Sequence, residues 1–144
     1  MKKLLLTLFF VMPIYAESQM VPLNKYMEDQ NMSDPNVLFY VSARCGAINF
    51  NMADLSENRK ELYERGSTAG QHYTQMAISV RKVIQPNDSP EENKRLSINS
   101  ISSIANEYVK VMNDNYAKTG TYFTDWMLED LSICSALYDM SIQE

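Results

Sequence analysis

Apolar side chains recur every three or four residues along most of the chain after residue 34. This spacing places them on one face of an α-helix, and no stretch keeps the alternation that a half-buried strand requires. The repeat occurs in four segments. The first two consist of Leu38, Val41, Cys45, Ile48, Met52 and Leu55, and of Leu62, Gly66, Ala69, Tyr73, Met76, Val80 and Val83. The last two consist of Ile98, Ile101, Ala105, Tyr108, Met112 and Asn115, and of Phe123, Met127, Asp130 or Leu131, Cys134, and Leu137 or Tyr138. The pattern predicts an all-α protein.

Residues that begin or end helices stand at the edges of these segments. Pro35 follows Asp34 and Pro90 follows Ser89, so each pair offers a capping side chain before a proline at the first helical position. Gly120 suits a left-handed helix end. We therefore expect helices over about 35–54, 57–84, 90–118 and 121–140.

The connections between the four expected helices are short. Ser56 is expected to cap the second helix directly after the first one ends, and turn-forming residues at 85–88 separate the second helix from the third. Short connections favour antiparallel neighbours, so we expect an up-down-up-down four-helix bundle within a single helical domain over 34–144. In such a bundle the first and last helices lie side by side.

The first sixteen residues have the pattern of an export signal. Two lysines precede an apolar run over residues 4–12, and Ala16 precedes the polar Glu17. These are the basic, apolar and small-residue regions of a secretory signal peptide over residues 1–16. The apolar run is shorter than the ~20 residues that span a bilayer, and an uncleaved N-terminal anchor is the alternative. We expect cleavage after Ala16, an N-terminal arm over 17–33, and a periplasmic or secreted location.

The charge of the chain disfavours two classes of binding partner, nucleic acid and anionic lipid. It carries 18 acidic and 13 basic residues, a formal net charge of −5. Loss of residues 1–16 removes Lys2 and Lys3, which leaves 11 basic against 18 acidic residues and a charge of −7. An acidic surface repels nucleic acid and anionic lipid, so we expect no nucleic acid and no membrane as a partner after cleavage. A protein partner is expected, and the oligomeric state is left open.

The two cysteines, Cys45 and Cys134, fall in the middle of the first and last expected helices. The bundle brings these two positions to one level, and an exported protein folds under oxidising conditions. We therefore expect an inter-helix disulfide, with two buried free thiols as the alternative. A redox-active pair is disfavoured because the Cys-x-x-Cys spacing is missing.

Four residues are candidates for a ligand site or groove. Gly66 and Gly70 interrupt the second expected helix, where glycine costs ~1 kcal/mol in helix propensity. Close helix approach, a bend in the helix or a groove floor under a ligand would offset that cost. Tyr73 lies on the same helix, and Arg44 adjoins Cys45. Arg44 is also expected to form an ion pair with an acidic residue of the last helix.

Catalytic and metal-binding patterns are scarce. His72 is the only histidine, so a zinc site built from several His and Cys ligands is not expected. A Gly-x-Ser-x-Gly turn and phosphate-binding glycine loops are also missing. We expect no metal, no cofactor and no catalytic residues.

Two functions from different classes remain. The first is a small exported, non-catalytic interaction or accessory protein, such as an inhibitor, immunity-like factor, chaperone or subunit. The second is a carrier that holds a small ligand or cofactor in the bundle interior, around Arg44, Gly66, Gly70 and Tyr73. An enzyme that depends on His72 ranks third.

Overall fold

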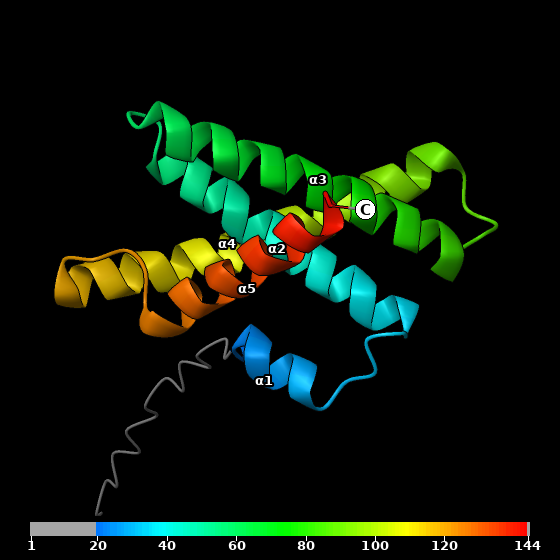
Figure 1. Ribbon diagram of the computed structural model, residues 1–144, viewed down its shortest axis with the longest axis horizontal. Helices are drawn as coiled ribbons and strands as arrows, with labels where there is room; N and C mark the ends of the chain where they lie inside the picture. The colour runs from blue at the N-terminus through cyan, green and yellow to red at the C-terminus, as the bar shows by residue number, and fades with distance from the viewer. Residues whose placement is uncertain (1–19, 144) are drawn as a thin grey trace, which may run out of the picture.

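The computed structural model describes residues 20–143, so the predicted signal peptide lies outside the described residues. Within this part the chain is entirely helical, without strands, which confirms the predicted fold class (Figure 1). Its five helices are α1 (Leu23–Glu28), α2 (Pro35–Leu55), α3 (Lys60–Ile84), α4 (Pro90–Thr119) and α5 (Asp125–Ser141).

The predicted caps define the ends of α2 and α4. The Asp34 carboxylate accepts a hydrogen bond from the Asn36 N–H at 2.8 Å, and Pro35 opens α2. Ser89 Oγ accepts from the Glu92 N–H at 3.1 Å, at the start of α4. Gly120 ends α4 with a φ of 76°, a conformation that favours glycine.

Two helices begin later than predicted. Helix α3 starts at Lys60 rather than 57, because Ser56 is buried at the end of α2 and its N–H bonds to the Ala53 carbonyl at 2.9 Å. Helix α5 starts at Asp125 rather than 121, because Thr124 is the residue that caps it, accepting from the Met127 N–H at 3.4 Å. Ser56 therefore ends α2 instead of capping α3, and Thr124, three residues after the predicted start, caps α5.

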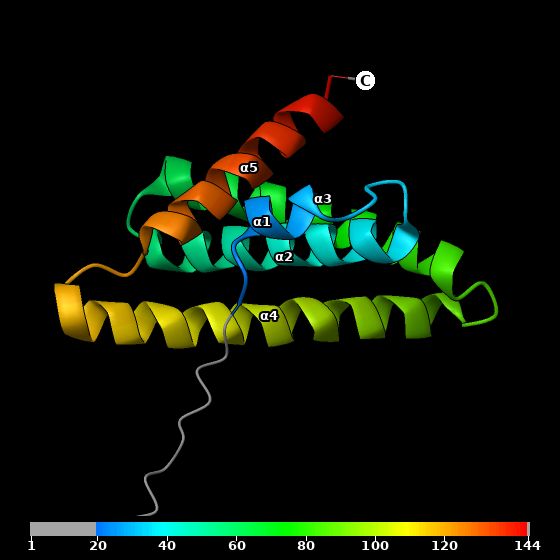
Figure 2. The ribbon, with the colours of Figure 1, turned by 90° about the horizontal axis from the view of Figure 1, so that it is seen from below.

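Helix α2 forms the centre of the molecule. Every residue from Val41 to Asn49 is buried, so the middle of α2 is enclosed on all sides rather than along one stripe. It contacts α3, α4 and α5, and Figures 1 and 2 show these helices arranged around it. The regular up-down-up-down bundle stays a prediction: successive long helices reverse direction, but α2 is enclosed more deeply than one helix of a regular bundle.

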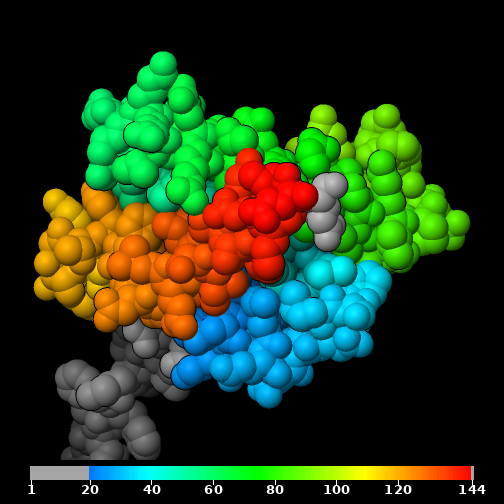
Figure 3. Space-filling model, viewed as in Figure 1, coloured from blue at the N-terminus to red at the C-terminus, as the bar shows by residue number. Residues whose placement is uncertain are grey.

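The segment expected as an N-terminal arm contains α1, which packs against α5. Leu23 on α1 is completely buried in the main hydrophobic cluster. The space-filling view shows α1, α3 and α5 covering the middle of α2 on this side (Figure 3).

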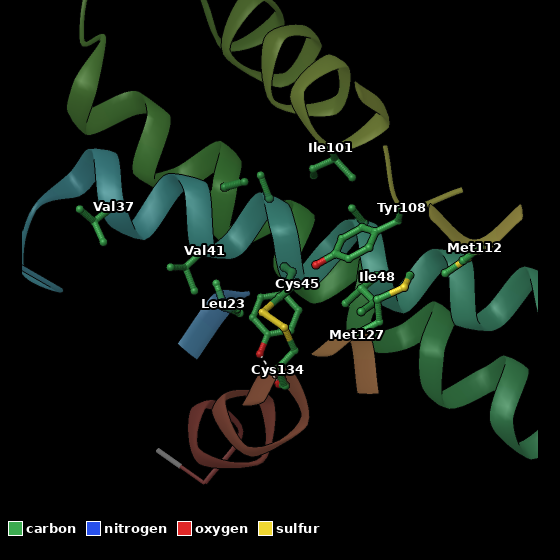
Figure 4. Packing of buried hydrophobic residues seen from close by; sticks show 14 residues of the cluster. Leu23, Val37, Val41, Cys45, Ile48, Ile101, Tyr108, Met112, Met127 and Cys134 are labelled. Carbon is green, nitrogen blue, oxygen red and sulfur yellow. Dashed lines mark hydrogen bonds between the residues drawn. A yellow bond between two sulfur atoms is a disulfide. The ribbon is translucent and has the colours of Figure 1, made fainter. Parts of the chain in front are cut away.

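The core gathers around the contact between α2 and α5. Figure 4 shows the two cysteines joined at its centre, with Leu23, Ile48 and Met127 nearby. All five side chains are fully buried, so each helix except α3 and α4 contributes at least one residue to this centre. Tyr73 from α3 and Tyr108 from α4 complete the enclosure.

Candidate functional site

A disulfide joins α2 to α5 between Cys45 and Cys134, as predicted. The S–S distance is 1.99 Å and the two Cα atoms are 5.3 Å apart. Both cysteines are fully buried, and Tyr73 Oη donates a hydrogen bond of 2.5 Å to the Cys134 carbonyl. A thiolate from solution would have to reach these sulfur atoms through the core, so the disulfide serves to stabilise the fold.

A buried polar cluster lies beside the disulfide. The guanidinium of Arg44 on α2 forms an ion pair of 2.5 Å with Asp130 on α5, which confirms the expected link between the first and last long helices. Tyr108 of α4 joins both groups: its hydroxyl accepts from Arg44 Nε at 2.9 Å and donates to Asp130 Oδ2 at 2.6 Å. Arg44, Tyr108 and Asp130 are all completely buried.

The start of α1 closes this cluster. The Val21 carbonyl accepts a hydrogen bond from Arg44 Nη1, and the Leu23 N–H donates to Asp130 Oδ1 at 2.7 Å. The charged groups therefore have polar partners on several sides, as a buried ion pair requires. Because its donors are engaged inside the core, Arg44 is not placed to meet a ligand from solution.

Aromatic rings surround the guanidinium and affect its ionisation. The Arg44 Cζ atom lies 5.6 Å from the ring centroid of Tyr108 and 5.9 Å from that of Trp126. Burial alone lowers the pKa of Arg44, but the neighbouring Tyr108, Asp130 and Tyr40 outweigh it and raise the pKa. For Tyr108, burial is the largest cause of a strongly raised pKa. The cluster therefore holds a charged arginine against a neutral tyrosine.

The other predicted site residues lie at helix contacts. A Cβ atom on Gly66 would come within 2.8 Å of the Asn49 carbonyl oxygen of α2, and one on Gly70 within 2.8 Å of the Phe50 ring. Tyr73 is buried below them and bonds to α5. The structure thus places Arg44, Gly66, Gly70 and Tyr73 in helix packing and does not gather them into one open site.

An open groove of about 830 Å³ lies between α3 and α4, over α2. Its α4 wall consists of Ile98, Ile101, Ser102, Ala105, Asn106 and Val109, which share one helix face. Its α3 wall consists of Thr68, Gln71, His72, Thr74 and Gln75, and its floor of Phe50, Asn51 and Asp54 from α2. The groove therefore has a mainly apolar side, formed by the α4 wall and Phe50, and a polar side that carries amides, hydroxyls and the Asp54 carboxylate.

Two contacts hold the floor of the groove in place. Asn51 Nδ2 donates to the Ala105 carbonyl at 3.0 Å, which ties α2 to the α4 wall. Gly70 leaves room for the Phe50 ring to lie against α3, so the glycine lies directly behind the groove although it does not line it. The floor is thus rigidly positioned by elements on both sides.

Sequence reasoning missed the groove as a site. Ile98 and Ala105 belong to the predicted core stripe of the third expected helix, yet both line the open groove and Ile98 is 41% exposed. A signal was present, because Ile98, Ile101, Ala105, Tyr108 and Val109 make an apolar face wider than contact with one neighbouring helix needs. The pattern does not tell which half of such a face is left open.

His72 lies at the margin of the groove and contacts α5. Its Nε2 atom is 2.9 Å from Ser141 Oγ, and its ring meets that of Tyr138 edge-on at a centroid distance of 5.1 Å. The Ser141 hydroxyl also donates to the Tyr138 carbonyl at 2.7 Å, so it links the His72 ring to the backbone of α5. His72 therefore anchors the end of α5.

Residues 20–143 contain neither a group of metal ligands nor a membrane-spanning helix. In that range no three His, Cys, Asp or Glu side chains are grouped so that they could hold a metal ion. No helix there has both the length and the apolar character needed to cross a bilayer. Comparison of the chain with known protein families, curated proteins and solved structures finds no match.

Proposed function

We propose that the chain is a small exported, non-catalytic interaction protein that holds an amphipathic helix of a protein partner in the α3–α4 groove. The observation that carries this proposal is that α2, α3 and α4 each present one helix face to the same open space. Three such faces form the walls that a further helix would complete in a helical bundle. Helix-in-groove recognition lays the apolar face of a helix against an apolar surface, and the α4 wall together with Phe50 offers such a surface here.

The dimensions of the groove agree with a helix as occupant. From Ile98 to Val109 the α4 wall spans eleven residue steps, which is roughly 16 Å at the rise of an α-helix. That length accommodates about three turns of a partner helix. Three turns place apolar residues at positions i, i+3 or i+4, and i+7 against the α4 wall.

Export is part of the proposal and has its own support. The N-terminal pattern is that of a signal peptide, and the buried Cys45–Cys134 disulfide is typical of proteins outside the cytosol. The intact mass of the protein from an exported fraction tests it. A mass beginning at Glu17, two hydrogens below that of the reduced chain, is expected, and a mass that retains Met1 contradicts cleavage.

The second candidate is a small-ligand carrier, favoured by the groove volume. A space of about 830 Å³ lies within the range of small-molecule sites. The carrier expected from the sequence would use the bundle interior near Arg44 and Tyr73, but those side chains are hydrogen-bonded within a packed core. A carrier role would therefore use the groove, and a small molecule co-purifying with the native protein would favour it.

Site-specific photo-crosslinking tests the interaction function. A photoreactive amino acid replaces Val109 in the groove or, as a control, Leu128, an exposed apolar residue of α5 that does not line the groove. In the producing cells, the Val109 position is expected to form an adduct with a segment whose apolar residues follow helical spacing. Identical adducts from both positions, or an adduct with a non-helical segment, contradict the proposal.

A further inference from the structure

We infer that the groove selects a partner helix with basic residues at one end, next to Asp54. This inference rests on the proposed helix-binding function and adds the chemical class of the partner. It follows from the charges along the groove and from the chain's net charge of −5.

Ionised side chains in the groove lining are of one sign. Asp54 is exposed on the floor, and the residues that line the groove include no lysine or arginine. The apolar residues around it are neutral, so an approaching helix meets a negative potential from Asp54. A basic side chain of the helix gains attraction there, while an acidic one is repelled.

The charges beyond the lining extend this asymmetry toward one end. Glu61 and Glu64 precede Thr68 at helical spacing, so they continue the groove face of α3 toward its first turn. That turn follows directly after the end of α2, which carries Asp54. Lys60 lies there too, and it forms a 3.8 Å ion pair with Glu64. This end therefore keeps an excess of negative charge.

The opposite end of the groove lies at the α3–α4 turn. Lys82 continues the groove face of α3 there, and Lys94 and Arg95 precede Ile98 on α4. Glu92 neutralises Arg95 through a 2.5 Å ion pair, and Glu91 lies on the same face. Three basic residues against two acidic ones leave this end slightly positive, so the groove differs in charge between its two ends.

Peptide binding to the oxidised mature protein tests the inference. The probes are three synthetic 18-residue amphipathic peptides with one leucine face and glutamine elsewhere. Their last turn carries three lysines, three glutamines or three glutamates. Fluorescence anisotropy at low salt measures their affinities. We expect the lysine peptide to bind at least about tenfold more tightly than the glutamate peptide, with the difference shrinking as salt is added.

Two pairs of variants locate the binding. Ile98→Glu is expected to abolish binding of every peptide, while Leu128→Glu leaves it unchanged. Asp54→Lys is expected to remove the preference for lysine. Asp114→Lys makes the same charge change on the face of α4 opposite the groove and is expected to keep the preference. Circular dichroism of each variant verifies that it is folded.

Each contrary result has a distinct meaning. If all three peptides bind equally and Ile98→Glu abolishes their binding, the basic preference is wrong and the helix-binding function stands. If no binding depends on Ile98, the helix-binding function itself is wrong. Equal effects of Asp54→Lys and Asp114→Lys mean non-specific attraction to an acidic protein, which overturns the inference. A wild-type dimer that Ile98→Glu converts to a monomer means that a second copy fills the groove, and this also overturns it.

Discussion

Helix α2 is covered in two different ways on its two sides. Toward α5 it forms a disulfide and a buried ion pair, and every charged group there has hydrogen-bonding partners. Toward α3 the contact depends on the absence of side chains, because Gly66 brings the two backbones together. Beyond that close contact, α3 and α4 leave the groove open.

The difference separates the part of the molecule that holds the fold together from the part that leaves an open groove. The residue types that commonly form functional sites are engaged in the core on the α5 side. They are an arginine, an aspartate, two tyrosines and both cysteines. The groove side carries ordinary apolar and amide side chains. Reactive residue types therefore lie in the core of this protein, and exposed apolar positions line its open groove.

The largest expected effect comes from breaking the covalent link on the α5 side. Cys45→Ser and Cys134→Ser each release a loop with a sequence separation of 89 residues. Chain entropy predicts a loss of about 4–5 kcal/mol in the free energy of unfolding for this loop length. Urea denaturation measures it. The double variant is expected to be no less stable than either single one, and additive losses would contradict a shared bond.

The buried ion pair on the same side is expected to rank next. Asp130→Ala leaves the Arg44 guanidinium charged and without its carboxylate inside the core, which costs about 3–5 kcal/mol. Urea denaturation of the double variant Arg44→Met with Asp130→Ala should show a smaller loss than the two single losses combined. Glu64→Ala, which breaks the exposed pair with Lys60, is the matched control and should change stability by less than about 1 kcal/mol.

The sequence carries most of the information for the α5 side. The spacing of apolar residues predicts the helices, and the positions of Cys45 and Cys134 in the middle of two of them predict the disulfide. Both features can be read directly from the sequence. The partner of Arg44 was predicted only as one of several acids, because Asp125, Glu129 and Asp130 all stand on α5. Side-chain direction, which only the packed structure supplies, selects Asp130.

The groove and the packing of α1 cannot be read from the sequence, for a different physical reason. A short helix such as α1 has too few residues for a periodic pattern, so the sequence does not show that Leu23 is buried in the core and that its N–H bonds to Asp130. The groove depends on how far α3 and α4 diverge, which is a property of tertiary packing. Gly66 and Gly70 indicate a close approach but do not tell what lies beside it.

Alkaline pH should weaken the side of the molecule that contains Tyr73 and Tyr108. Burial is the largest cause that raises the pKa of both hydroxyls above the ordinary value of 10. The unfolded chain therefore loses these protons first, so stability is fully present below pH 10 and falls above it. The expected slope is up to about 1.4 kcal/mol per pH unit for each tyrosine.

Urea denaturation between pH 9 and 11.5 measures this slope. Tyr73→Phe should be less stable at pH 8, because it loses the hydrogen bond to the Cys134 carbonyl, but its stability should fall less steeply above pH 10. Tyr116→Phe changes an exposed tyrosine and is the matched control. A Tyr73→Phe profile parallel to that of the wild type would contradict a buried neutral hydroxyl in the folded state.

The smallest effects are expected where α2 meets α3, and two glycines there should respond in opposite directions. A methyl group on Gly66 would lie 2.8 Å from the Asn49 carbonyl oxygen, so Gly66→Ala must push the helices apart. Such overpacking costs about 1–3 kcal/mol. On Gly46 the nearest atoms would be 3.6 Å away, an ordinary contact. Gly46→Ala should therefore keep the packing and gain up to about 1 kcal/mol from helix propensity.

Thermal and urea denaturation of the two variants measure this difference under identical conditions. The same substitution in the same pair of helices isolates the space around each glycine as the variable. If both variants gain stability, the α2–α3 contact has room to relax, and the groove beside it is then a soft surface rather than a preformed one. Loss of stability in Gly66→Ala alone means that close backbone contact holds the floor of the groove, which is what a preformed binding surface requires.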